Sequence, residues 1–325
     1  MRRGLSFGLR ILISAALLYL VARKIPFDTF VSSLRRVNVP LMLVSYLLIP
    51  VMGYIDANRT KMMADIQGLT LSINQIVRIG FITSFYSLFL PGYLAGGVIR
   101  WHRMARHDNK PAQAFATIVY TRLLSTIVTA LVGLSCWLLD GGASGRRPGF
   151  GIGLGALFVM LCFGHWLLFS SDRAQWFADW VGRFAVVPRI ALEKLGKVLR
   201  SVGKFDEVSG WRLASTLGLL VLSELMGILS FYLISAAMHL GLSPVSVGWV
   251  RAYISLVTLL PISIMGMGVR DGSLVVMLSA YGVVPALAVT YSVLLLTRTI
   301  VLGLLGGACE LWNIMRFRTG AAEPS

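Results

Sequence analysis

The chain has 325 residues, of which 56% are hydrophobic and 14% charged, and its mean hydropathy is +0.77. A soluble globular protein carries about 25% charged residues, so these values exclude a chain built from soluble domains. The formal net charge is +16, but the basic residues lie between long apolar runs. That placement argues against nucleic-acid binding and for contact with anionic lipid head groups.

Apolar runs of the kind that cross a bilayer occur six times along the chain. A helix takes about 20 residues to cross the hydrocarbon core. The first run follows two arginines and ends at Arg23-Lys24 without a small-residue cleavage site, so we expect an uncleaved span rather than a signal peptide. The six predicted spans are 9–22, 40–57, 112–139, 150–169, 211–240 and 285–312.

Two further apolar stretches, about 73–106 and 245–283, are each interrupted in the middle by proline and glycine. Each half is too short to cross the bilayer, and proline with clustered glycine ends a helix. Broken backbone at membrane depth is tolerated only where it is buried in protein or lines a cavity. Both stretches are therefore predicted to be re-entrant helical hairpins. The residues at the breaks are Pro91, Gly96, Gly97, Pro261, Gly266 and Gly268.

The distribution of charge predicts the orientation. With the N-terminus in the cytoplasm, 20 of the 30 Lys and Arg fall on the cytoplasmic side and 8 on the other, while Arg122 and Arg298 fall within spans. This follows the positive-inside rule. We therefore expect a protein integral to the bacterial cytoplasmic (inner) membrane with both termini in the cytoplasm. The loop at 172–211 is then a basic cytoplasmic loop, and 317–325 is a short polar tail.

The layout contains an internal repeat within a single membrane domain, 1–325. The predicted fold is all-α, and each pseudo-repeat, about 8–140 and 150–316, has two spans, a broken hairpin and a third span. Three spans separate the two hairpins, so the repeats are inverted. Both share the pattern P-x4-G-x3-R, which ends at Arg100 and at Arg270. Inverted repeats with broken helices are typical of transporters that bind their substrate at the break.

Four arginines are candidate substrate-binding residues together with the six break residues. Arg100 and Arg270 follow the breaks, where helix N-termini favour anions, and Arg122 and Arg298 lie near mid-depth. The planar guanidinium suits phosphate. In the alternative interpretation, the first two arginines snorkel to the interface and the other two form structural ion pairs. The glycines would then serve only close helix packing. The predicted ion-pair partners are Asp271, Glu224 and Asp56.

Glu224 and Asp271 are candidate coupling carboxylates. For Glu224, in the middle of a span, a hydrogen bond to a neighbouring helix is the alternative. The three cysteines are far apart, the four histidines show no ligand spacing, and no catalytic motif is present. The sequence therefore predicts no metal, no cofactor and no catalytic residue, and a transporter-like protein rather than an enzyme.

The motifs at the two breaks carry a family resemblance. Phe89-Leu90-Pro91-Gly92 with Gly96-Gly97, and 260–271 with its Gly266-Met267-Gly268-Val269-Arg270-Asp271, resemble the lysylphosphatidylglycerol synthase transmembrane, or flippase-like, family. The likeness extends from about residue 8 to 315. Asp271 stands where the family often has Glu, and Thr121 where it often has an acidic residue. The resemblance implies the stand-alone membrane form without the aminoacyl-transfer domain, with a role in moving lipid.

Three functions follow as hypotheses. The first is a flippase or transporter of a phospholipid or lipid-linked glycan with a phosphate-bearing head group. The second is an intramembrane lipid transferase, which needs a nucleophile or base that the sequence does not reveal. The third is a non-transporting partner of an envelope-biosynthesis enzyme that docks on the segment 174–208. The expected partners are membrane lipids and, for the third hypothesis, that enzyme, with no nucleic acid.

Overall fold

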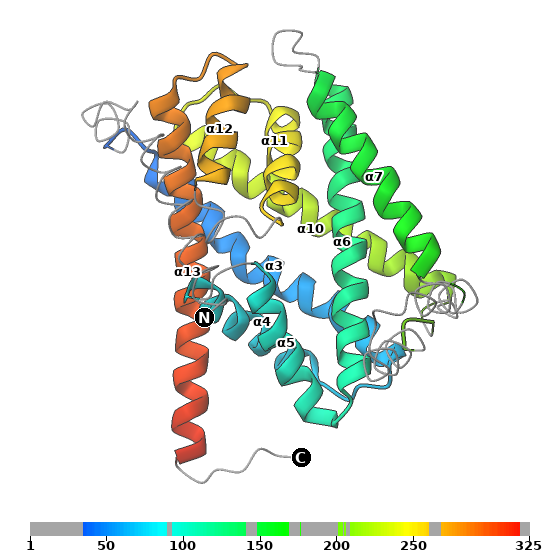
Figure 1. Cartoon of the computed structure of the whole chain (residues 1–325). Helices are drawn as coiled ribbons and strands as arrows, with labels where there is room; N and C mark the ends of the chain where they lie inside the picture. The colour runs from blue at the N-terminus through cyan, green and yellow to red at the C-terminus, as the bar shows by residue number, and fades with distance from the viewer. Residues whose placement is uncertain are drawn as a thin grey trace, which may run out of the picture.

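The computed structural model describes residues 35–89, 93–140, 148–168, 176, 201–203, 205, 209–259 and 268–318. All regular structure in these residues is helical (Figure 1). Five of the helices are long and apolar enough to cross a membrane. They are α3 (Val39–Ile66), α6 (Pro111–Leu139), α7 (Pro148–Leu168), α10 (Gly210–Ala237) and α13 (Pro285–Arg318). The predicted all-α polytopic membrane fold is confirmed. The predicted span 9–22 and most of the loop 172–211 lie outside the described residues.

Proline marks where several helices begin. Pro40, Pro111 and Pro244 lie in the first turn of their helices, where the N–H that proline lacks would have no helical partner. The Asn38 side chain also caps α3 by accepting a hydrogen bond from the Leu41 N–H at 3.3 Å. These signals explain why the predicted starts of the spans lie close to the observed ones.

The end of α3 differs from the prediction. The helix continues to Ile66 rather than ending near residue 57, so Arg59 and Lys61 are helical rather than part of a loop. Ion pairs spaced three and four residues apart, Asp56–Arg59 and Lys61–Asp65, extend along this segment. Such pairs stabilise a helix surface, so the change from apolar to charged sequence does not end the helix.

Four shorter helices form two hairpins. They are α4 (Ile73–Phe89), α5 (Tyr93–Asp108), α11 (Pro244–Val257) and α12 (Val269–Ser279). With 11 to 17 residues each, they rise about 17 to 26 Å. The hydrocarbon core is about 30 Å thick, so none of the four is long enough to cross it upright.

The outer ends of α4 and α5 meet where α6 begins. The backbone N–H of Thr70, just before α4, donates to Asp108 Oδ2 at 2.8 Å at the end of α5. The indole N–H of Trp101 donates to the carbonyl of Pro111, the first residue of α6, at 2.8 Å. The first hairpin therefore starts and ends at one level of the molecule, beside the N-terminus of α6.

The outer ends of α11 and α12 meet instead where α6 ends. Asp140, which follows α6, accepts hydrogen bonds from the Trp249 indole at 3.1 Å and from the Tyr281 hydroxyl. Burial raises the pKa of Tyr281 to about 12, and the Asp140 hydrogen bond acts in the same direction, so the phenol remains a donor. Since the 29 residues of α6 rise about 43 Å, the two hairpins enter from opposite ends of the molecule.

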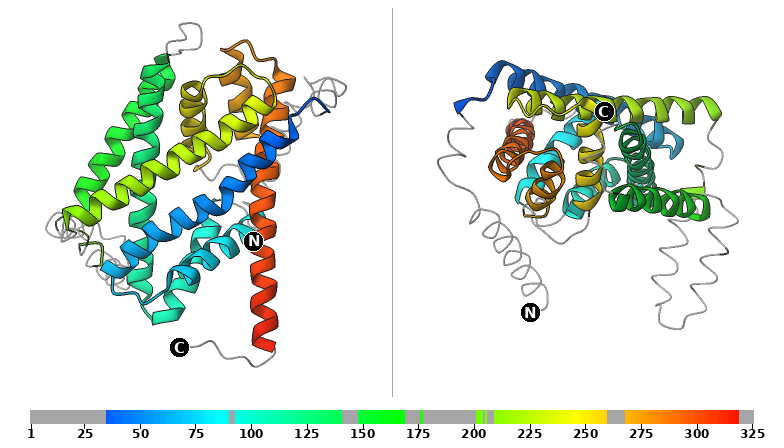
Figure 2. Two further views of the ribbon diagram at one scale, coloured as in Figure 1. Left: turned by 180° about the vertical axis from the view of Figure 1, so that it is seen from behind. Right: turned by 90° about the horizontal axis from the view of Figure 1, so that it is seen from above.

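The two halves pack mainly against each other. Helix α3 runs antiparallel to its counterpart α10, and the Asn38 N–H donates to the Ala237 carbonyl at 2.9 Å. Figure 2 shows these two helices side by side along one face. Helix α4 of the first half packs on α13 of the second, and α11 of the second packs on α6 of the first. Each hairpin therefore rests on the long helix of the other half.

Glycines allow the close approach at both of these crossed interfaces. A Cβ at Gly306 of α13 would collide with the carbonyl oxygen of Phe81 in α4. In the equivalent interface, a Cβ at Gly133 of α6 would collide with Ala252 of α11. Helices in membranes associate through small residues that bring their backbones together.

The structure describes three of the six predicted break residues, Gly96, Gly97 and Gly268, and Gly268 alone of these three lies at a break. Pro91, Pro261 and Gly266 lie outside the described residues. Gly268 has φ +81° and is the N-cap of α12, as expected for a glycine that precedes a helix. The prediction that Gly96 and Gly97 lie at the break of the first hairpin is wrong, because α5 begins at Tyr93 and includes both glycines.

Packing against α4 explains the first of these two glycines. A Cβ at Gly96 would collide with the Ser87 side chain and crowd that of Thr83, whereas the space beside Gly97 is open. Gly96 therefore brings the two arms of the hairpin together, and the weak helix propensity of glycine is outweighed by that packing.

We expect Gly306→Ala to destabilise the protein by about 1–3 kcal/mol, because the new methyl meets backbone that cannot rotate away. Gly218→Ala in α10 is the matched control, because a Cβ there has no neighbour within 4 Å. The control should be neutral or slightly stabilising, since alanine favours the helix. Thermal unfolding in detergent measures both variants, and equal midpoints would contradict the close packing of α13 on α4.

Candidate functional site

A polar cavity of about 520 Å³ lies between the two halves. Every described helix except α7 contributes to its wall, so both hairpins and four long helices meet there. Its lining includes a belt of serine and threonine hydroxyls, three of which come from one face of α6: Ser125, Thr126 and Thr129. A hydrated polar cavity inside a bundle of membrane-crossing helices is the setting in which intramembrane charge is found.

Six arginines line this cavity: Arg59, Arg100, Arg122, Arg251, Arg270 and Arg298. The four arginines predicted from the sequence are among them, two from each half. Arg59 and Arg251 are additional. In the charge count that predicts the orientation, Arg59 is one of the 20 cytoplasmic residues, beyond the end of a span, and Arg251 is one of the 8 on the other side, near the outer end of a hairpin. No local signal in the sequence places either residue at the cavity, because their positions depend on where α3 ends and on how α11 packs.

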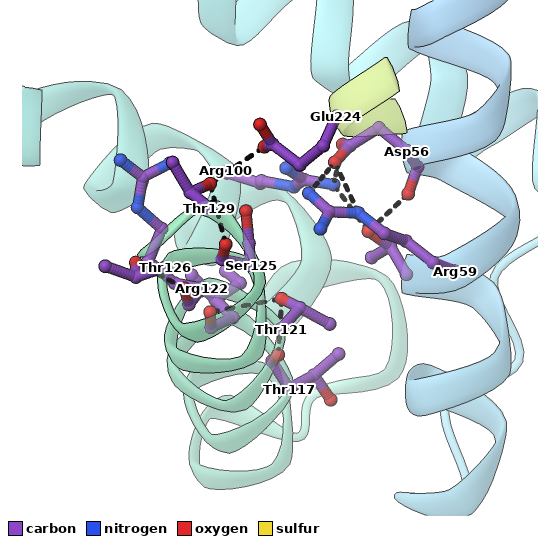
Figure 3. A network of polar contacts seen from close by, with 12 residues as sticks. Asp56, Arg59, Arg100, Thr117, Thr121, Arg122, Ser125, Thr126, Thr129 and Glu224 are labelled. Carbon is purple, nitrogen blue, oxygen red and sulfur yellow. Dashed lines mark hydrogen bonds and ion pairs between the residues drawn. The ribbon is translucent and has the colours of Figure 1, made fainter. Parts of the chain in front are cut away.

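Asp56 on α3 holds two of these arginines. Arg59 donates from Nε to Asp56 Oδ1 at 2.8 Å, and Arg100 donates from Nη2 to Asp56 Oδ2 at 3.0 Å (Figure 3). The same Nη2 also donates to the hydroxyl of Thr60 at 2.8 Å. One carboxylate thus compensates two guanidinium groups, and the cluster keeps one positive charge in excess.

Glu224 on α10 holds a third arginine. Its Oε1 accepts a hydrogen bond from the Thr129 hydroxyl at 2.8 Å, and its Oε2 forms an ion pair with Arg251. The Arg251 guanidinium also lies 5.6 Å from the centre of the Phe231 ring and packs against Gly227. The hydrogen bond to a neighbouring helix that the sequence suggested for Glu224 is present, and it connects α10 with α6 and α11.

Arg270 is buried at the start of α12 beside Asp271. Its Nε donates to the Ser292 hydroxyl of α13 at 3.0 Å, and its Nη2 lies 3.3 Å from Asp271 Oδ1. The other Asp271 oxygen accepts the Gly268 N–H at 2.8 Å, so this carboxylate caps the helix, as favoured at an N-terminus. Asp271 therefore serves the hairpin's structure and does not line the cavity.

Arg298 on α13 differs from the arginines just described. Its Nη2 contacts the Met52 sulfur at 3.1 Å, and a thioether is a weak acceptor. Its Nε is buried and has no hydrogen-bond partner in the part of the chain that the structure describes, where Arg298 also forms no ion pair. The alternative prediction that Arg298 pairs with Asp56, Glu224 or Asp271 is therefore wrong, because each of these carboxylates binds another arginine.

Arg122 on α6 also lines the cavity and is the most exposed of the six arginines. Figure 3 shows it on the same helix as the hydroxyls of Ser125, Thr126 and Thr129. Arg122 and Arg298 thus contribute to one cavity from equivalent long helices of the two halves. The arrangement offers guanidinium groups and hydroxyls to an anion with polar substituents.

No curated protein matches this sequence. The family described as the lysylphosphatidylglycerol synthase TM region matches residues 8–307. The match includes all the helices that form the cavity, although the last turns of α13 extend past it. The chain belongs to the lysylphosphatidylglycerol synthase transmembrane region family.

Proposed function

We propose that the protein is a flippase that moves a phospholipid or a lipid-linked glycan with a phosphate-bearing head group. The observation that carries the proposal is the convergence of six arginines from both halves on one cavity between membrane-crossing helices. A phosphate without polar partners is prohibitively unfavourable in hydrocarbon. Guanidinium groups form strong, often bidentate hydrogen bonds to phosphate, and the surrounding hydroxyls replace further water of the head group.

The inverted hairpins suit a carrier with alternating access. Both line the cavity, and they enter from opposite ends of the molecule. In the proposed cycle, movement of α4 and α5 opens the cavity to one side, and movement of α11 and α12 opens it to the other. The head group then crosses without a continuous pore, and the acyl chains remain in the lipid.

The two other hypotheses account less well for this cavity. A docking subunit of an envelope enzyme needs no arginine-lined cavity. A lipid transferase needs a nucleophile or general base, and the two carboxylates that line the cavity, Asp56 and Glu224, are both held in ion pairs. Glu224 remains our candidate for ion coupling because it lines the cavity. The capping role of Asp271 makes it the weaker candidate.

We further propose that the protein lies in the bacterial cytoplasmic membrane with both termini in the cytoplasm. Assigning Arg59, Arg100, Arg251 and Arg270 to the cavity removes two residues from each side of the earlier count. Eighteen Lys and Arg then remain on the cytoplasmic side and six on the other, so the positive-inside bias becomes stronger. The first hairpin accordingly opens to the cytoplasm.

Accessibility labelling tests this orientation. In a chain whose three cysteines are replaced by serine, Arg106→Cys at the exposed end of α5 should react with an impermeant thiol reagent only in opened cells. Ser279→Cys at the exposed end of α12 should react in intact cells. The reverse pattern would show that the protein has the opposite orientation in the membrane. Labelling of both sites from one side would contradict the prediction that the two hairpins enter from opposite sides.

Arg298 provides the sharpest test of transport. Arg298→Gln should abolish lipid translocation in proteoliposomes while the yield of folded protein in detergent stays near that of the wild type, because no carboxylate loses its partner. Arg298→Lys keeps the charge but loses the planar fork, so translocation should still be impaired. A loss of activity that only follows a loss of yield would contradict a role for Arg298 in substrate binding.

Arg251→Gln is the matched comparison for that test. This change leaves Glu224 buried without its guanidinium, at a cost of about 3–5 kcal/mol, so the yield itself should fall. The double variant Arg251→Gln with Glu224→Gln should recover part of the yield. If the single and double variants give the same yield, the Arg251–Glu224 ion pair does not stabilise the fold.

A further inference from the structure

Positive charge is in excess at two places beside one turn of α3. At the first, Asp56 is shared between Arg59 and Arg100. At the second, Arg298 contacts the uncharged sulfur of Met52. Arg251 and Arg270 are each matched by one carboxylate. Without counting Arg122, the five remaining arginines face three carboxylates, which leaves two positive charges.

The two places are held close together by the helix. Met52 and Asp56 are four residues apart on α3, and both line the cavity. Residues at that spacing lie on one face of a helix with about 6 Å between their Cβ atoms. The two cationic points therefore flank a single helical turn of one wall.

Each point also retains hydrogen-bonding capacity. The Nε atoms of Arg100 and Arg298 are buried, and neither has an acceptor among the residues that the structure describes. Buried polar groups are rarely left without partners in proteins. An anion that extends to both cationic points would supply hydrogen-bond acceptors to Arg100 and to Arg298. An anion that reaches one point would leave the other arginine without an acceptor.

We propose that the transported head group carries two phosphoryl groups, as in a lipid diphosphate, with one group bound by Arg59 and Arg100 and the other by Arg298. This inference rests on the proposed function and names the chemical class of its substrate. A diphosphate carries at least two negative charges, spread over two phosphorus centres. These match the two excess positive charges and their separation into two places in the cavity. A lipid phosphodiester supplies one charge, and a phosphomonoester places its charge on one centre.

A matched series of short-chain lipids tests the proposal by calorimetric binding to the full chain in detergent. The series has identical dioctanoyl chains and ends in phosphatidylglycerol, phosphatidic acid or diacylglycerol diphosphate. The diphosphate should bind at least about tenfold more tightly than phosphatidic acid, because a second charge-assisted contact is worth about that factor. Inorganic diphosphate should bind more weakly than the lipid diphosphate, because the acyl chains add apolar contact.

Two variants each remove the excess positive charge at one of the two places, and neither leaves a carboxylate without an arginine. Arg59→Gln leaves Arg100 on Asp56, and Arg298→Gln leaves no carboxylate without its partner. Both should reduce the affinity for the lipid diphosphate to that for phosphatidic acid. Arg106→Gln is the control, because this exposed arginine of α5 does not line the cavity, and it should leave all affinities unchanged.

The outcomes separate this inference from the proposed function. Equal affinities for lipid diphosphate and phosphatidic acid, with translocation intact, would overturn the two-group head group and leave the flippase standing. If inorganic diphosphate binds as tightly as the lipid diphosphate, the inference that the diphosphate belongs to a lipid is wrong. If no lipid of the series binds and proteoliposomes show no translocation, the proposed function itself is wrong.

Discussion

Guanidinium groups inside a membrane domain need carboxylates or other acceptors close by, and this requirement shapes the centre of the protein. Charges in the membrane interior are costly and are found only where partners or water-filled cavities receive them. Here the partners come from different helices, since Asp56 on α3 binds Arg100 on α5, and Glu224 on α10 binds Arg251 on α11. Each ion pair thus fixes a hairpin to a long helix of its own half.

The same pairs keep the cavity charged rather than neutral. Because three carboxylates face a larger number of arginines, pairing reduces the electrostatic cost without removing the attraction for anions. Removal of an arginine has different consequences at different positions. Arg251 shares a buried ion pair, so we expect the fold to depend on it, whereas Arg298 forms no ion pair among the described residues and contacts the Met52 sulfur, so we expect it to serve a ligand.

The sequence predicted the architecture well because its signals are local. The spans follow from apolar length, their starts from proline, and the opposed hairpins from the number of spans between two breaks. The four arginines that follow the breaks or fall within spans could be identified for the same reason. Arg59 and Arg251 could not, because their place depends on where α3 ends and on how α11 is inserted. The three carboxylates were identified as ion-pair partners, but their pairing with Arg100 and Arg251 was not predicted, since it depends on contacts between different helices.

The crossed packing of the halves has a consequence for biogenesis. Helix α4 is made early but rests on α13, the last described helix. Helix α6 likewise presents Gly133 to α11, which begins more than a hundred residues later in the chain. During synthesis, the N-terminal half therefore sits in the lipid with an incomplete interface until the C-terminal half arrives. Such a chain matures as one interlocked unit, and a nascent protein halted between the halves is expected to be a substrate for membrane quality control.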